Sequence, residues 1–123
     1  MSRELTSHKV NGLNDALKIE VLDEPGQGNA CHAYRLSLVE GEFSGKICDI
    51  NFQNGPIKEA GFNGISQESL LAIVKDRLES FQSGPYACAT NQQALNHVVA
   101  AMDSLHSRTR ERVARNVEGT HSV

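Results

Sequence analysis

Four arginines lie close together near the C-terminal end of the sequence, at Arg108, Arg110, Arg112 and Arg115. Three of them, Arg108, Arg112 and Arg115, follow the i, i+4, i+7 spacing that places side chains on one face of an α-helix. A guanidinium can hold a phosphate with two parallel hydrogen bonds, so this face could bind an anion. Arg110 lies off the face and is expected to point into solvent.

The same helical face is apolar upstream of the arginines. Leu95, Val98, Met102 and Leu105 form its stripe, and a further step of seven residues from Leu105 reaches Arg112. An arginine beside a core costs free energy unless an anion meets it, which an internal carboxylate or a bound phosphate would do. Two alternatives stay open: a solvated last turn that complements the helix dipole, and an interface with a protein or a nucleic acid.

Phe81 and Asn91 flank the turn between two expected helices. Phe81 completes the apolar stripe of the first helix, which favours core packing, but beside a Gly-Pro turn it could also stack on a nucleotide base. Asn91 lies in the first turn of the next helix, where asparagine often serves as a local cap. Its amide could instead pair with an adenine edge, as donor and acceptor together.

Nothing in the sequence predicts catalysis, a metal centre or a bound cofactor. There is no Ser/His/Asp or Cys/His order with a supporting motif, and His97 is expected to be solvated. Cys31, Cys48 and Cys88 are an odd number at wide spacing, which favours small buried thiols over disulfides. No C-x-x-C or H-x-x-x-H pair indicates zinc. The Gly26–Gly28 segment lacks the rest of a dinucleotide fingerprint.

The charge is unevenly distributed. The whole chain has a net charge of −3, while residues 108–115 carry +3, so the other residues together carry −6. One positive spot in an acidic body favours a small anionic ligand over a nucleic-acid polymer. No apolar run approaches the roughly 18 residues of a membrane span, and no signal peptide is visible, so we expect a cytosolic protein without membrane contact.

The first half of the sequence predicts a sheet. Segments 17–22, 32–39 and 47–53 alternate apolar and polar residues and are joined by short loops, which predicts an antiparallel meander over about residues 16–53. The side chains expected on the inward face are Leu17, Ile19, Val21, Tyr34, Leu36, Leu38, Cys48, Ile50 and Phe52.

The second half predicts a helical hairpin over about residues 66–116. Ser66 is the expected N-cap of the first helix, and Ser83-Gly84-Pro85 ends it. Thr90, with Gln93, fits the capping box of the second helix, which would extend to Arg115 or Asn116. Gly119 would stop it.

We therefore expect one α+β domain, residues 1–123, in which the small sheet packs with two antiparallel C-terminal helices. Open sheet edges and a small core favour a homo-oligomer.

Five segments, taken in order, resemble the phage-encoded Thoeris anti-defence family of the first type. The similarity extends over nearly the whole chain, from about Leu17 to His121. The segments are Glu24–His32, Phe52–Ile57, Phe81–Asn91, Arg108–Arg112 and Val117–His121.

This resemblance implies a protein that sequesters a signal and is not an enzyme. Members of the family bind cyclic ADP-ribose isomers, such as glycocyclic ADP-ribose, made by bacterial immune TIR enzymes, and hold them intact in the host cytoplasm. Some members also bind cyclic trinucleotides of the related CBASS defence at a separate site. The family forms homodimers and hexamers, and its ADP-ribose sites lie at the dimer interface.

The resemblance also implies roles for particular residues. Phe81 would stack on the adenine of the ligand, Asn91 would make a polar contact, and Arg108 and Arg112 would meet the phosphates and riboses. The loop around Gln27 and Gly28 would cover the site from the neighbouring subunit. Some relatives have an arginine near Gln27, and the uncharged residue here removes one phosphate contact.

Two hypotheses of other classes remain. The same pocket could belong to an enzyme that cleaves or modifies the nucleotide. The basic end of the second helix could also serve a small module that binds nucleic acid or protein, although the acidic body disfavours nucleic acid.

Overall fold

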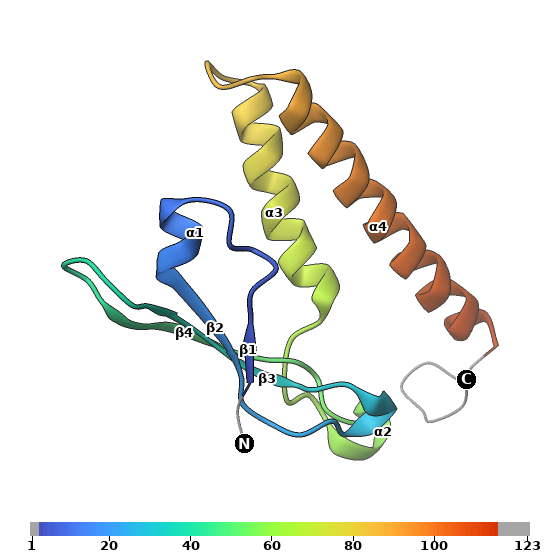
Figure 1. Cartoon of the computed structure of the whole chain (residues 1–123). Coiled ribbons are helices and arrows are strands. Elements are labelled where there is room, and N and C mark those ends of the chain that lie inside the picture. The colour runs from blue at the N-terminus through green and yellow to red at the C-terminus, as the bar shows by residue number, and fades with distance from the viewer. Residues whose placement is uncertain (1–2, 116–123) are drawn as a thin grey trace. The chain divides into compact units, whose positions relative to one another are not determined.

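The computed structural model describes residues 3–115, except for the side chain of Gln27 (Figure 1). The chain forms two compact units. The first unit is residues 1–65 and the second is residues 66–123. The elements of the first unit are β1 (Arg3–Leu5), α1 (Gly12–Ala16), β2 (Leu17–Val21), η1 (Gln27–Asn29), β3 (Ala33–Leu38), β4 (Gly45–Asn51) and α2 (Ile57–Ala60). The second unit contains α3 (Gln67–Gln82) and α4 (Ala89–Ala114). The prediction of a single domain stays a prediction.

The sheet is antiparallel throughout, with strand order β1-β2-β3-β4. The three predicted strands are present, and the α+β fold class is confirmed. The predicted number of strands was wrong, because β1 pairs with β2 from Arg3↔Val21 to Leu5↔Ile19. A strand of three residues is too short for an alternating pattern to identify it.

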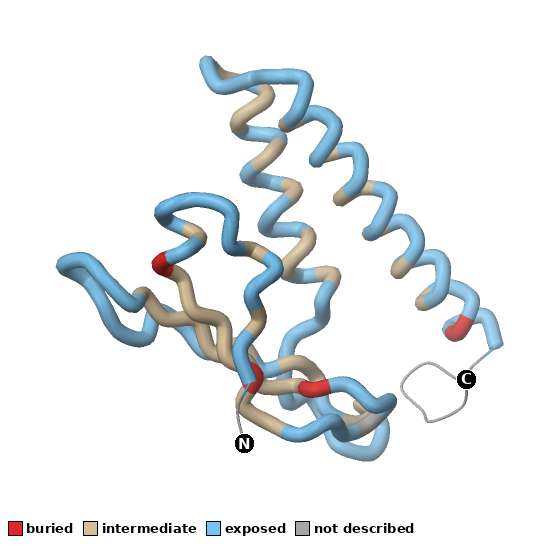
Figure 2. The backbone as a smooth tube through the Cα atoms, viewed as in Figure 1, coloured by how far each residue is buried: buried red, intermediate tan, exposed pale blue. Residues whose placement is uncertain are grey.

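The core of the first unit is small and lies around β2. Val21 is 0% exposed and pairs with Tyr34 of β3, while Ala16 and Cys31 are also buried. The Tyr34 ring meets Phe52 edge to face, with centroids 5.6 Å apart. Figure 2 shows how few described positions are buried.

The prediction of buried thiols was right only for Cys31. Cys48 and Cys88 are exposed. Cys48 lies on β4, most of whose residues are exposed, and Cys88 lies in the turn that precedes α4. Cys48 is exposed because β4 is an edge strand of the open sheet, and an edge strand is covered less than the strands inside the sheet.

The loop after β4 is closed by side-chain amides. The Gln53 amide donates to the carbonyls of Gly55 and Gly61, and the Asn63 side chain pairs with both the N–H and the carbonyl of Asn54. Gly64 crosses the end of β4 so closely that an added Cβ would lie 2.4 Å from the carbonyl carbon of Phe52. Only glycine fits such an approach of two backbones.

The second unit is an antiparallel pair of helices, which we call the hairpin. Ser66 caps α3 as predicted, with its hydroxyl accepting from the Ser69 N–H. The predicted cap of α4 was wrong, because the helix begins at Ala89 and the Cys88 sulfur accepts from the Asn91 N–H at 3.4 Å. Thr90 therefore lies inside the first turn. Helix α4 ends at Ala114, with Arg115 as its C-cap, and Gly119 lies outside the described residues.

The hairpin buries no apolar side chain completely within residues 66–115. Its apolar positions, such as Leu78 and Leu105, are half-buried, and Val74 is 43% exposed. Two helices alone make one layer, and a core needs at least a second. Neither α3 nor α4, nor any other helix of the described chain, has the length and apolar character to cross a membrane.

Candidate ligand-binding site

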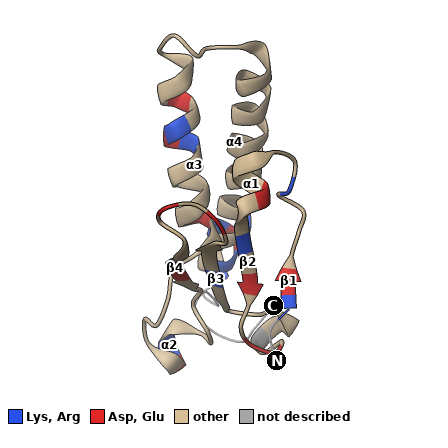
Figure 3. Cartoon of the chain, turned by 60° about the vertical axis from the view of Figure 1, so that its left-hand side comes forward, with Lys and Arg blue, Asp and Glu red and all other residues tan. Residues whose placement is uncertain are grey.

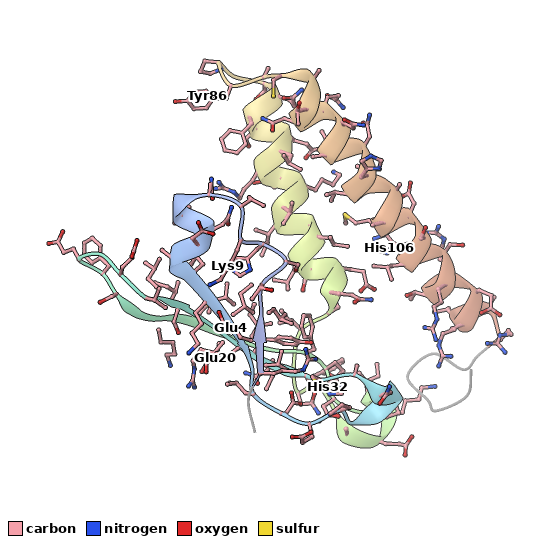
Figure 4. The ribbon with its side chains drawn as sticks, in the orientation of Figure 1. Glu4, Lys9, Glu20, His32, Tyr86 and His106 are labelled. Carbon is pink, nitrogen blue, oxygen red and sulfur yellow. The ribbon has the colours of Figure 1, made fainter. Side chains whose placement is uncertain are left out.

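Aromatic and amide side chains gather at the turn of the hairpin, residues 83–88, which we call the tip loop. Phe81, in the last turn of α3, is half-buried. The Arg77 guanidinium, one helical turn earlier, lies over its ring at 5.3 Å from the centroid. The Tyr86 ring is 6.2 Å from the Phe81 ring, with a tilt of 59°. Figure 4 labels Tyr86 on this loop.

Asn91 belongs to the same group of side chains. Its side-chain amide donates to the carbonyl of Tyr86 at 3.4 Å, while no described residue donates to its side-chain oxygen. An amide keeps two donor hydrogens and one carbonyl oxygen, so Asn91 can still offer a donor and an acceptor to a base edge. Two of the predicted site residues, Phe81 and Asn91, thus both contact Tyr86 of the tip loop.

The other pair of predicted residues lies at the far end of α4. Arg108 is exposed, and Arg112 is 9% exposed. Arg112 belongs to the last turn of α4, where a positive charge complements the helix dipole. Arg115 pairs with Glu111. Arg110 is exposed, as predicted.

One chain does not bring the two pairs together. Asn91 and Arg108 belong to the same uninterrupted helix of 26 residues. At a rise of about 1.5 Å per residue, they are separated by about 25 Å, and Asn91 and Arg112 by about 32 Å. A single cyclic dinucleotide-like ligand is far shorter than that. Figure 3 also shows that the half of α4 next to the tip loop carries no Lys, Arg, Asp or Glu.

The predicted covering loop, Gln27 and Gly28, lies in the first unit. Gly28 and Asn29 adopt left-handed backbone angles, with φ values of 70° and 64°, in the short helix η1. Backbone hydrogen bonds from Gly26 to Ala30 and from Asn29 to Gly26 close the loop. Glycine allows this conformation without a steric cost, and asparagine tolerates it better than most residues.

Asp23 holds the base of this loop. Its carboxylate accepts from the backbone N–H of His32 at 2.9 Å and of Ala33 at 3.1 Å, and its carbonyl accepts from the Cys31 thiol. The hydrogen bond from the His32 N–H is the main reason that the pKa of the Asp23 carboxyl lies below its ordinary value. The loop is therefore pre-folded by a charged group, which the sequence analysis did not identify.

Among the described residues, concave regions lie within each of the two units. A polar pocket of about 340 Å³ lies beside Asp23, His32 and Asn51. An apolar groove of about 540 Å³ lies on the hairpin. The residues of the groove are Gln67, Leu70, Leu71, Val74, Ala101, Ser104 and Leu105. In the part of the chain that is described, no cluster of His, Cys, Asp and Glu could hold a metal ion.

Sequence reasoning missed Arg77 and Tyr86. Arg77 could have been identified from its spacing, because it lies four residues before Phe81 and so on the same side of the helix. Tyr86 lies in a Gly-Pro turn, and nothing in the sequence indicates the direction of its side chain.

The fold defines a small α+β protein whose C-terminal part is a two-helix hairpin. Residues 45–109 match the family described as "Acb2/Tad1, hairpin domain", and the chain belongs to that family. The matched segment contains Phe81, Asn91 and Arg108, and it ends before Arg112.

A curated relative agrees with this assignment. Over 80 residues, the chain is 44% identical to "Thoeris anti-defense 1" of Bacillus phage SBSphiJ7. The alignment covers 65% of this chain and 56% of the relative, so the chain spans about half the length of the curated protein it matches. The resemblance drawn from the sequence motifs is confirmed.

Proposed function

We propose that this protein inhibits Thoeris defence in an infected bacterium by binding a cyclic ADP-ribose isomer, such as glycocyclic ADP-ribose, and holding it intact. The ligand carries a base, two riboses and a pyrophosphate. A base fits the Phe81 and Asn91 end of the hairpin, and a pyrophosphate fits the guanidiniums of Arg108 and Arg112. The protein acts by mass action in the host cytoplasm and needs neither a catalytic residue nor a metal.

The observation that carries this proposal is the separation of the two half-sites along one straight helix. A ligand can meet both only if they come from different chains. An antiparallel pair of α4 helices related by a two-fold axis places the tip loop of one chain beside the arginines of the other, and does so twice. We therefore propose that the protein assembles as a homodimer with two equivalent binding sites, or as a hexamer built from such dimers.

The groove on the hairpin supports this arrangement. It is lined mainly by aliphatic side chains, and the hairpin alone has no second layer to cover them. A second copy of the same chain would cover the groove and complete the site in one step. The loop around Gln27 and Gly28, pre-folded by Asp23, would then close over the ligand from the neighbouring subunit.

The energetics are compatible with sequestration. Competition with an immune effector needs a Kd of tens of nanomolar or below, about −10 to −12 kcal/mol. Two hydrogen-bonded guanidiniums contribute about 1.5–3 kcal/mol each, and a stacked base about 1–3 kcal/mol. Pre-folded half-sites reduce the ordering cost of binding. Cyclic trinucleotides, which some family members bind, are a second class of ligand to test.

An incubate-and-release assay tests the proposal. The purified protein is mixed with cyclic ADP-ribose isomers and filtered, and the filtrate and the heat-denatured retained fraction are analysed by HPLC. We expect the ligand to leave the filtrate and to return unchanged on heating. A new product would establish an enzyme instead, and a ligand that stays in the filtrate would refute binding.

A further inference from the structure

Tyr86 is the large aromatic side chain of the tip loop, and it is 72% exposed. Its backbone is nevertheless held in place, because its carbonyl accepts from the Asn91 side chain at 3.4 Å. The Gln82 side chain adds a second brace by accepting from the Cys88 N–H at 3.0 Å. An exposed aromatic ring on a braced loop is a feature of ligand-contacting surfaces more than of cores.

The contacts of the Phe81 ring indicate how the Tyr86 ring would meet a bound base. Arg77 lies over the Phe81 ring, so a stacked base has to take the side of the ring that the guanidinium leaves open. Tyr86 flanks Phe81 at 6.2 Å with a tilt of 59°, which is too close and too inclined for a base to lie between two parallel rings. The two rings form an open angle, in which one ring meets the face of a base and the other meets its edge.

We propose that Tyr86 is a second base-contacting residue, and that Phe81 and Tyr86 together form a two-walled aromatic site for the purine base of the ligand. This inference rests on the proposed function. Asn91 would have two roles in this site. Its side-chain amide donates to the Tyr86 carbonyl, and the same amide offers a further donor and an acceptor to the edge of the base. One ring on the face of a base and another at its edge select a flat purine over a ligand with no base.

The chain contains two tyrosines and no tryptophan, which makes the test direct. In the Tyr34→Phe variant, all tyrosine emission comes from Tyr86. In the Tyr86→Phe variant, it comes from Tyr34, which packs against Phe52 in the first unit. A cyclic ADP-ribose isomer is titrated into both variants, with excitation on the red edge of the tyrosine absorption, where adenine absorbs little. We expect quenching in Tyr34→Phe and none in Tyr86→Phe.

Calorimetric affinities complete the test. Tyr86→Ala should weaken binding about 5- to 150-fold, the range given by loss of one aromatic contact to a base, while Tyr86→Phe keeps the ring and stays within about 3-fold of wild type. Helical content by circular dichroism confirms that the hairpin is folded in each variant.

The outcomes separate the two proposals. If the wild-type protein binds the ligand but Tyr86→Ala binds equally well and Tyr34→Phe shows no quenching, the role of Tyr86 is refuted and the proposed function stands. If the wild-type protein binds no cyclic ADP-ribose isomer, both fail.

Discussion

At the scale of single residues, the two predicted phosphate-binding arginines differ in burial. Arg112 is 9% exposed, while Arg108 is exposed one turn earlier. A buried guanidinium has to be met by acceptors in the folded chain, so its removal is costly for stability. An exposed guanidinium is hydrated and can be removed with little effect on folding. Arg108 is therefore the position at which binding can be tested without disturbing the fold.

Replacement of Arg108 by Ala should weaken ligand binding about 10- to 150-fold, which corresponds to about 1.5–3 kcal/mol for a charge-assisted hydrogen bond. The free energy of unfolding should change by no more than about 0.5 kcal/mol. The matched control is Arg110→Ala, which removes the same charge from another exposed position of α4. Calorimetric titration of both variants checks the prediction. If the two variants lose equal affinity, Arg108 acts only through the net charge of the protein and does not contact the ligand.

Asp23 gives a prediction about pH. The pKa of its carboxyl is lowered in the folded protein, so the carboxylate stabilises the fold above its unfolded pKa, near 3.8, and this stabilisation is lost as the pH falls through the folded value. Asp23→Asn should therefore be less stable than wild type at neutral pH, and the difference in melting temperature should shrink as the pH falls below about 3.8.

Thermal unfolding across the range from neutral to strongly acidic pH measures this difference. The exposed Asp103 on α4 provides the control, because Asp103→Asn removes a carboxylate that lies outside the loop. A difference between wild type and Asp23→Asn that stays constant at every pH would show that the charge of Asp23 does not hold the loop.

At the scale of elements, the start of α4 depends on an unusual cap. Cysteine is a weaker acceptor than a hydroxyl, and the Cys88 sulfur accepts the Asn91 N–H at the long distance of 3.4 Å. Cys88→Ser should stabilise the hairpin by about 0.5–1 kcal/mol, because serine is among the preferred N-cap residues. Thr90→Ala should be neutral or slightly stabilising, since Thr90 lies inside the helix, where alanine is the better helix former.

Melting temperatures of these two variants distinguish the two possible helix starts. If Thr90 were the cap, its replacement by Ala would instead cost about 1 kcal/mol, and Cys88→Ser would have no effect.

The elements differ in how well the sequence predicts them. Strands β2, β3 and β4 and the cap Ser66 follow from alternation and from a hydroxyl before an apolar stripe, and both signals are local. Strand β1 pairs with residues 14 to 18 positions further along the chain. The braces made by Asp23, Gln53 and Asn63 span no more than ten residues, but they depend on the loop conformation, which no alternating or helical pattern reveals. The cap at Cys88 was missed because Thr90 carries a stronger local signal than cysteine does.

In the candidate site, too, the features that lie within one helix were predictable from the sequence, and those that depend on loop conformation were not. The helical phase of Arg108 and Arg112 and the position of Phe81 before a turn can be read from the sequence, since each concerns one helix. Their separation follows from the same helix once its length is known. The role of Tyr86 depends on the conformation of the tip loop, which only the structure supplies.

At the scale of the whole molecule, the hairpin groove should hold a second copy of the chain. Val74 lines the groove and is 43% exposed, so Val74→Glu places a charge in the proposed dimer contact without entering a core. We expect the variant to become monomeric and to lose ligand binding by at least about 10-fold, because the monomer holds only half-sites. Sedimentation and calorimetry measure the two effects.

The matched control for this variant is Asn96→Asp. It adds the same negative charge at an exposed position of α4 that does not line the groove. This control should keep the oligomeric state and the affinity of the wild type. A Val74→Glu protein that is monomeric and still binds fully would exclude a site shared between chains.

The proposed site, shared between two chains, predicts a rescue of binding that a site within one chain would not give. Phe81→Ala inactivates the tip-loop half of both sites in its homodimer, and Arg108→Ala inactivates the arginine half of both. In a heterodimer of the two variants, one site combines both defects and the other combines both intact halves, because the two-fold axis exchanges the ends of α4. Random pairing makes about half of the dimers mixed, so about one quarter of the wild-type number of tight sites should return.

Co-expression of the two variants, followed by calorimetric measurement of stoichiometry, tests this directly. Homodimers of each variant measured alone give the baseline, and a mixture that binds no better than their average would place the whole site within one chain, against the separation of about 25 Å along α4.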